Sequence, residues 1–140
     1  MPQQKPVLGL FAKVGLPWAL DDTSPYRLSV MTKAATQHLE NKQGFFLLIE
    51  GSQIDWGGHN NDIAAAMGEM DDLAKTLEYL ETYVAKYPNT LVIVTADHST
   101  GGLTVAANGI YQWHPDYLRM LKHSPNVIAS ILTDEEITAE

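Results

Sequence analysis

Two apolar runs, each with polar residues directly behind it, dominate the hydrophobic pattern of this 140-residue chain. Residues 45–49 read Phe-Phe-Leu-Leu-Ile, and residues 90–95 read Thr-Leu-Val-Ile-Val-Thr. Short apolar runs that are rich in β-branched and aromatic residues predict buried strands. Residues 7–12 and 103–107 show a similar pattern, and we expect two further strands there.

A helical period separates the two main strands. From residue 63 to residue 86, apolar residues recur at every third or fourth position, with charged residues between them, which predicts one long amphipathic helix. The apolar positions are Ala66, Met70, Leu73, Leu77, Leu80 and Val84, and the polar stripe holds Glu69, Asp72, Lys75, Glu78 and Glu81.

Shorter patterns predict the remaining helices. Residues 29–40 have helical spacing, and residues 115–122, 127–132 and 133–139 predict short helical pieces. The last begins with Thr133-Asp-Glu-Glu136, the form of a capping box. Alternation of strands and helices favours a three-layer α/β sandwich with a mainly parallel sheet, formed by residues 1–140 as a single domain.

Composition narrows the possible functions. The chain carries 17 Asp and Glu against 9 Lys and Arg, which argues against a surface that binds nucleic acid. It has no cysteine, so disulfides and thiolate zinc sites are excluded. No apolar run has the length of a membrane span, and the first residues do not have the form of a signal peptide.

Carboxylate and imidazole groups follow both main strands. Glu50, Asp55 and His59 come after the first, and Asp97 and His98 come after the second. Ligands bind outside the carboxyl ends of parallel strands, and zinc accepts nitrogen and oxygen donors. These pairs therefore favour a metal site, and the lone carboxylate of Glu50 suits Mg²⁺.

Asp55 and His59 are four residues apart, which would place both on one face of a helix. Gly57 and Gly58 argue against a regular helix there, and a tight loop would bring the same two ligands together. Adjacent Asp97 and His98 share a metal only if the chain turns after them.

Each of these residues also has a structural interpretation. An Asp beside a His in a loop is more often a surface pair than a ligand pair, and Glu50 at a strand end would also face water. Trp56 would line a substrate pocket or simply pack. His114 is a possible ligand, although a loop His beside Pro is more often structural. Ser52, Ser99 and Thr100 lack a neighbouring base and are interpreted as turn residues rather than nucleophiles.

The two motifs Gly44-Phe-Phe-Leu-Leu-Ile-Glu-Gly-Ser-Gln-Ile-Asp-Trp-Gly-Gly-His59 and Thr90-Leu-Val-Ile-Val-Thr-Ala-Asp-His-Ser-Thr-Gly-Gly102 resemble those of bacterial alkaline phosphatases. The resemblance covers residues 7 to 118. It implies hydrolysis of phosphate monoesters through a phosphoserine intermediate, with two zinc ions and one magnesium ion. The Asp-His motif alone is shared with cofactor-independent phosphoglycerate mutases.

The resemblance also implies roles for individual residues. Glu50 matches the family's magnesium ligand. Asp55 and His59 match two ligands of the first zinc, and Asp97 and His98 match ligands of the second. Trp56 matches a variable position near the phosphate.

Several family elements have no match in these residues. The nucleophilic Ser, the metal-bridging Asp, the phosphate-binding Arg and the third zinc-binding His in a His-Thr-Gly motif are not found. We therefore expect a central fragment of an alkaline phosphatase that is inactive alone. Two alternatives stay open: a metal-binding or assembly module without catalysis, and a mutase-like phosphotransfer enzyme.

Two expectations concern the whole molecule. Members of the family are usually periplasmic or secreted. A chain that resembles only the middle of the family's fold would expose apolar strand edges, and we expect it to self-associate or form a homodimer.

Overall fold

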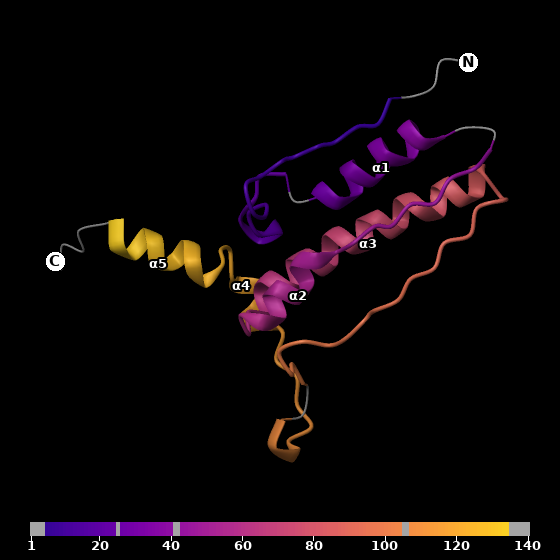
Figure 1. The fold of residues 1–140 in the computed structure, drawn as a ribbon. Coiled ribbons are helices and arrows are strands. Elements are labelled where there is room, and N and C mark those ends of the chain that lie inside the picture. The colour runs from indigo at the N-terminus through magenta and orange to yellow at the C-terminus, as the bar shows by residue number, and fades with distance from the viewer. Residues whose placement is uncertain (1–4, 25, 41–42, 105–106, 135–140) are drawn as a thin grey trace.

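The computed structural model describes residues 5–24, 26–40, 43–104 and 107–134. Its helices are α1 (Arg27–Leu39), α2 (Ser52–His59), α3 (Ile63–Lys86), α4 (Asp116–Met120) and α5 (Pro125–Asp134), with single 3₁₀ turns η1 (Ala19–Asp21) and η2 (Ala107–Gly109). In Figure 1, α1 and α2 lie along the long helix α3, and α5 points away from them.

The predicted helix over residues 63–86 is confirmed as α3. Its start is fixed by Asp62, whose side chain accepts a hydrogen bond from the backbone N–H of Ala65 at 3.0 Å. This N-cap satisfies one of the amide groups that a helix start leaves unpaired. The predicted helix over 29–40 is also confirmed, as α1.

The predicted polar stripe of α3 is partly wrong, because some of its charged residues are buried. Glu69 and Asp72 are 7% and 3% exposed, whereas Met70 is half exposed. Thr76, on the same face, is fully buried. This face packs against α1, where Thr36 forms a 2.6 Å hydrogen bond with Tyr79 of α3. The interface between the two helices is therefore largely polar.

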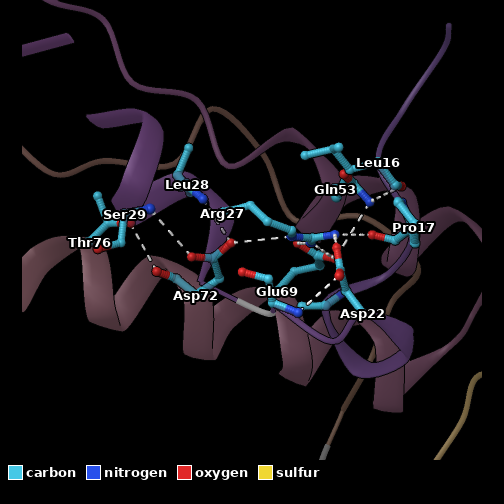
Figure 2. A network of polar contacts seen from close by, with 12 residues as sticks. Leu16, Pro17, Asp22, Arg27, Leu28, Ser29, Gln53, Glu69, Asp72 and Thr76 are labelled. Atoms are coloured by element: carbon cyan, nitrogen blue, oxygen red, sulfur yellow. Dashed lines mark hydrogen bonds and ion pairs between the residues drawn. The ribbon is translucent and has the colours of Figure 1, made fainter. Parts of the chain in front are cut away.

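Arg27, at the start of α1, explains how two carboxylates are buried there. Figure 2 shows its guanidinium between Asp22, Glu69 and Asp72. Two hydrogen bonds of 2.9 and 3.1 Å join it to the two oxygens of Glu69. Both bonds come from one guanidinium nitrogen, and such charge-assisted hydrogen bonds offset part of the cost of removing the charges from water.

Asp72 contributes to the same network from α3. Its carboxylate accepts hydrogen bonds from the backbone amides of Leu28 and Ser29, at 3.0 and 3.5 Å (Figure 2). These amides belong to the first turn of α1, where helices have no internal acceptor and where negative charge is favourable. Asp72 therefore fixes the start of α1 against α3.

The predicted strands do not form among the described residues. Residues 45–50 and 90–96 run as extended segments without a strand ladder (Figure 1). Residues 7–12 likewise form no strand. A strand requires a partner for its backbone groups, and these segments do not pair with one another. The mainly parallel sheet is thus not formed in this part of the chain.

Predictions for the C-terminal part had mixed outcomes. The helical piece predicted over 115–122 is confirmed as α4. The pieces predicted over 127–132 and 133–139 are not separate at their junction, because the single helix α5 covers 127–132 and continues to residue 134. The strand predicted over 103–107 falls partly on residues outside the described ranges, and Ala107 begins the 3₁₀ turn η2 instead. Glu136 of the predicted capping box also lies outside them. No helix among the described residues is long and apolar enough to cross a membrane.

Candidate metal centre

Asp55 and His59 both lie on helix α2, so the expectation of an irregular loop was wrong. One helical turn separates them, and His59 Nε2 lies 3.4 Å from Asp55 Oδ2. The two glycines that argued against a helix are buried within it. Helical spacing, rather than a tight loop, therefore brings this pair together.

Close packing explains why glycine is present in the last turn of α2. A Cβ atom on Gly57 would lie 2.9 Å from the backbone nitrogen of Ala66, and one on Gly58 would lie 2.6 Å from the carbonyl oxygen of Thr100. Gly101 has φ of +88°, and a Cβ there would strike the Gly58 carbonyl. The contacts between Gly58, Thr100 and Gly101 hold residues 97–101, called here the 97–101 loop, against α2.

This contact brings the two predicted pairs into one cluster. His98 Nδ1 lies 3.6 Å from Asp55 Oδ1, and His98 Nε2 lies 3.3 Å from Asp97 Oδ2. Asp55 thus faces both histidines. The side chains of Asp97, His98 and His59 are more than half exposed, whereas Asp55 is 32% exposed. The cluster is therefore open to solvent.

The spacing within each pair fits one edge of a zinc site. Zinc binds nitrogen and oxygen ligands at about 2.0–2.1 Å, so two ligands of a tetrahedral ion lie about 3.3 Å apart. The His59–Asp55 and His98–Asp97 distances of 3.4 and 3.3 Å match this edge. However, the described residues contain no group of three or more such side chains arranged to hold a metal ion. Each pair is thus half of a ligand set.

Asp55 Oδ1 provides a second observation that fits a bound cation. This atom is buried and has no hydrogen-bond partner among the described residues. A buried carboxylate oxygen without a partner is costly, and it requires an explanation. A cation bound beside it would satisfy this oxygen, so the donor set and the unpaired oxygen both fit a metal.

Glu50 lies in surroundings of its own. Glu50 is exposed and borders a hollow of ≈ 180 Å³ that Gln53, Glu69 and Asp72 also line. Gln53, in the first turn of α2, donates hydrogen bonds to the Leu16 carbonyl and Glu69 (Figure 2). Among the described residues, no hydrogen bond or ion pair joins Glu50 to the Asp55 cluster.

Trp56 packs against the N-terminal loop. A Cβ atom on Gly15 would lie 2.8 Å from the Trp56 ring, and the ring also borders a cavity of ≈ 330 Å³ together with Asp21 and Ser124. The ring is 42% exposed. This position is compatible with both expectations for Trp56, packing and a pocket wall.

Other residues took positions that the sequence did not indicate. His114 is exposed, and its ring nitrogen lies 3.3 Å from the Gln112 side chain rather than in the cluster. Thr100, interpreted as a turn residue, forms a 2.9 Å hydrogen bond with His98 Nδ1. Its position two residues after the histidine was the only signal for this contact.

Known proteins resemble this chain in both sequence and fold. A sequence model described as alkaline phosphatase matches residues 1–139. Alkaline phosphatase 3 of Bacillus subtilis (strain 168) is 45% identical over 130 residues, which cover 91% of this chain. The crystal structure of a cold-active alkaline phosphatase from a psychrophilic Shewanella sp. has a TM-score of 0.89 and 48% identity over 93% of this chain.

Similarity extends to more distant relatives. Alkaline phosphatase of Escherichia coli (strain K12) is 33% identical over 128 residues, covering 74% of this chain. The helices and the clustered Asp–His pairs thus belong to an alkaline phosphatase fold, and the chain is a member of the alkaline phosphatase family. It spans 28% of the length of the Bacillus subtilis relative and 33% of the Shewanella chain.

Proposed function

We propose that these residues supply metal ligands to an alkaline phosphatase that hydrolyses phosphate monoesters. The observation that carries this proposal is the meeting of Asp55, His59, Asp97 and His98, which come from α2 and the 97–101 loop. Asp55 and His59 are the proposed ligands of one zinc, and Asp97 and His98 are those of a second. Glu50, exposed next to the start of α2, is the proposed Mg²⁺ ligand.

Each residue has a defined task in this proposal. When bound, a pair of zinc ions stabilises the attacking and the leaving oxygen of a displaced phosphoryl group. Helix α2 holds the Asp55 oxygen and the His59 nitrogen at the separation of two ligands, which reduces the ordering required on binding. The exposed sides of Asp97 and His98 leave room for a phosphate group to approach. Trp56 is proposed to line the substrate pocket, where it would face the organic group of the phosphate monoester.

The extended segments support the same proposal at the level of the fold. Residues 45–50 lead directly into α2, and residues 90–96 lead directly into the 97–101 loop. We propose that both are strands of the family's mainly parallel sheet, whose pairing strands come from regions of the family that these residues do not match. The proposed ligands would then follow the carboxyl ends of two strands.

The proposal predicts that the isolated 140-residue chain does not turn over substrate. Neither Asp–His pair belongs to a larger group of metal-ligating side chains among the described residues, and the proposal assigns no nucleophile to this chain. The measurement is release of nitrophenol from its phosphate ester at alkaline pH with Zn²⁺ and Mg²⁺, with a chelator as the control. We expect no metal-dependent release.

The opposite result has a clear meaning. Release that is abolished both by the chelator and by Asp97→Ala would show that a nucleophile lies within these residues. The inactivity of the isolated chain would then be wrong, and the metal-ligand assignment would be supported.

A further inference from the structure

The cavity of ≈ 330 Å³ beside Trp56 is lined by residues of the N-terminal loop, α2 and the start of α5. Trp18 and Trp56 form aromatic walls, and Pro17 and Val127 add apolar ones. Asp21, the last residue of η1, borders the same cavity. The cavity therefore combines apolar walls with one carboxylate.

The turn that carries Asp21 is bonded to the rest of the fold. The backbone N–H of Asp21 donates a 2.9 Å hydrogen bond to the carbonyl of Trp18. Ala19, in the same turn, is buried, and its backbone N–H donates a 2.7 Å hydrogen bond to Glu69 of α3. The carboxylate of Asp21 is thus presented to the cavity from an anchored turn.

The two oxygens of Asp21 have unequal surroundings. Oδ1 accepts a 2.8 Å hydrogen bond from the backbone N–H of Ser124, and His123 Nδ1 lies 3.5 Å from the same oxygen. Oδ2 is buried and has no hydrogen-bond partner among the described residues. The side chain is 7% exposed, and no lysine or arginine in the described part of the chain forms an ion pair with it. A buried carboxylate oxygen in this state is costly, and a positively charged donor would satisfy it.

We propose that this cavity binds an organic ammonium ion, whose N–H groups face Asp21 and whose carbon chain packs against the apolar walls. An ammonium group donates charge-assisted hydrogen bonds to a carboxylate, and tryptophan rings attract cations. A metal ion suits the cavity less well, because the described residues contain no group of three or more metal-ligating side chains. The inference uses neither Asp–His pair, so it stands apart from the metal-ligand assignment.

The test compares two probes on the 140-residue chain, n-butylammonium and n-butanol, which share a carbon chain and differ in charge. Proton NMR follows the indole N–H resonances of the three tryptophans, Trp18, Trp56 and Trp113, at pH 8, where an ordinary imidazole is neutral. Trp113 does not line the cavity and is the internal control.

Butylammonium should shift the Trp18 and Trp56 resonances at a concentration about tenfold lower than butanol, because hydrogen bonds to charged groups are the stronger ones. Trp113 should respond only at higher concentrations. Equal concentrations for the two probes, or an equal response of Trp113, would overturn the inference.

Asp21→Asn tests the carboxylate itself, since the amide keeps an oxygen that can accept the Ser124 N–H and removes the charge. We expect this variant to lose the preference for butylammonium. Asp116→Asn is the matched control, because Asp116 is 87% exposed and does not line the cavity, and it should keep the preference. A folded Asp21→Asn chain that still prefers butylammonium would contradict the proposal. If this variant does not fold, the comparison of the two probes on the unmodified chain decides the question.

Discussion

Arg27 is the residue on which the buried polar interface most depends. Its guanidinium is 10% exposed and faces three carboxylates, and two of these, Glu69 and Asp72, are almost fully buried. It also donates a hydrogen bond to the carbonyl of Pro17 (Figure 2). One cation therefore joins the N-terminal loop, α1 and α3.

Replacing Arg27 with methionine should strongly destabilise the chain. Breaking a buried ion pair on one side leaves the other charge without compensation, which costs about 3–5 kcal/mol. We expect Arg27→Met to lower the free energy of unfolding by about 3 kcal/mol, measured by urea denaturation with circular dichroism.

Arg119→Met is the matched control, because the Arg119–Asp116 pair is 77% and 87% exposed. Ion pairs at such exposed positions contribute little to stability. Equal losses of stability in the two variants would contradict the importance given to the buried network.

The sequence indicated the residues of the candidate cluster more directly than the residues that support the fold around it. Asp55, His59, Asp97 and His98 were proposed because each follows an apolar run, and the structure brings them together. Arg27 was missed because its partner Glu69 lies 42 residues away. An alternation of charge along a helix does not reveal which charged residues will meet a cation from another helix.

At the level of elements, the packing contact between α2 and the 97–101 loop depends on Gly58. A methyl group there would overlap the Thr100 carbonyl. Extra atoms in a tightly packed contact typically cost about 1–3 kcal/mol, whereas replacing glycine by alanine in a helix gains about 1 kcal/mol. We therefore expect Gly58→Ala to keep α2 helical and to displace the exposed loop.

The measurement combines circular dichroism with proton NMR contacts between α2 and residues 98–100. Helical signal should be retained while those contacts disappear. Gly51→Ala is the control, because its added Cβ would meet only side-chain atoms, the end of Ile54 at 3.2 Å and Leu28 at 3.9 Å. If Gly58→Ala kept the contacts between α2 and residues 98–100, glycine would not be required for the packing of the loop on α2.

Helices α1 and α3 were predictable because their signals are local. Apolar spacing and the Asp62 cap lie within α3 itself, and its predicted ends match the observed ones. A strand needs a second strand to pair with, and that strand is often distant in sequence. Residues 45–50 and 90–96 pair with no other strand among the described residues. Their apolar pattern therefore indicates where a sheet would form but does not form one alone.

At the scale of the whole molecule, these extended segments expose apolar side chains. Phe46, Leu48, Leu91 and Ile93 are each more than three-quarters exposed. Unpaired backbone and exposed apolar side chains favour association with other chains. We predict that the isolated chain self-associates as its concentration rises, measured by light scattering. A single monomeric species at high concentration would contradict this prediction.

The most direct test of the account follows the five histidine rings of the 140-residue chain by NMR during a Zn²⁺ titration. We predict that His59 and His98 respond first, while His38, His114 and His123 respond only at much higher Zn²⁺ concentrations. Asp55→Asn should weaken the response of His59 more than that of His98, and Asp97→Asn should do the reverse. A uniform response of all five rings, unchanged in both variants, would contradict the assignment of two zinc-ligand pairs.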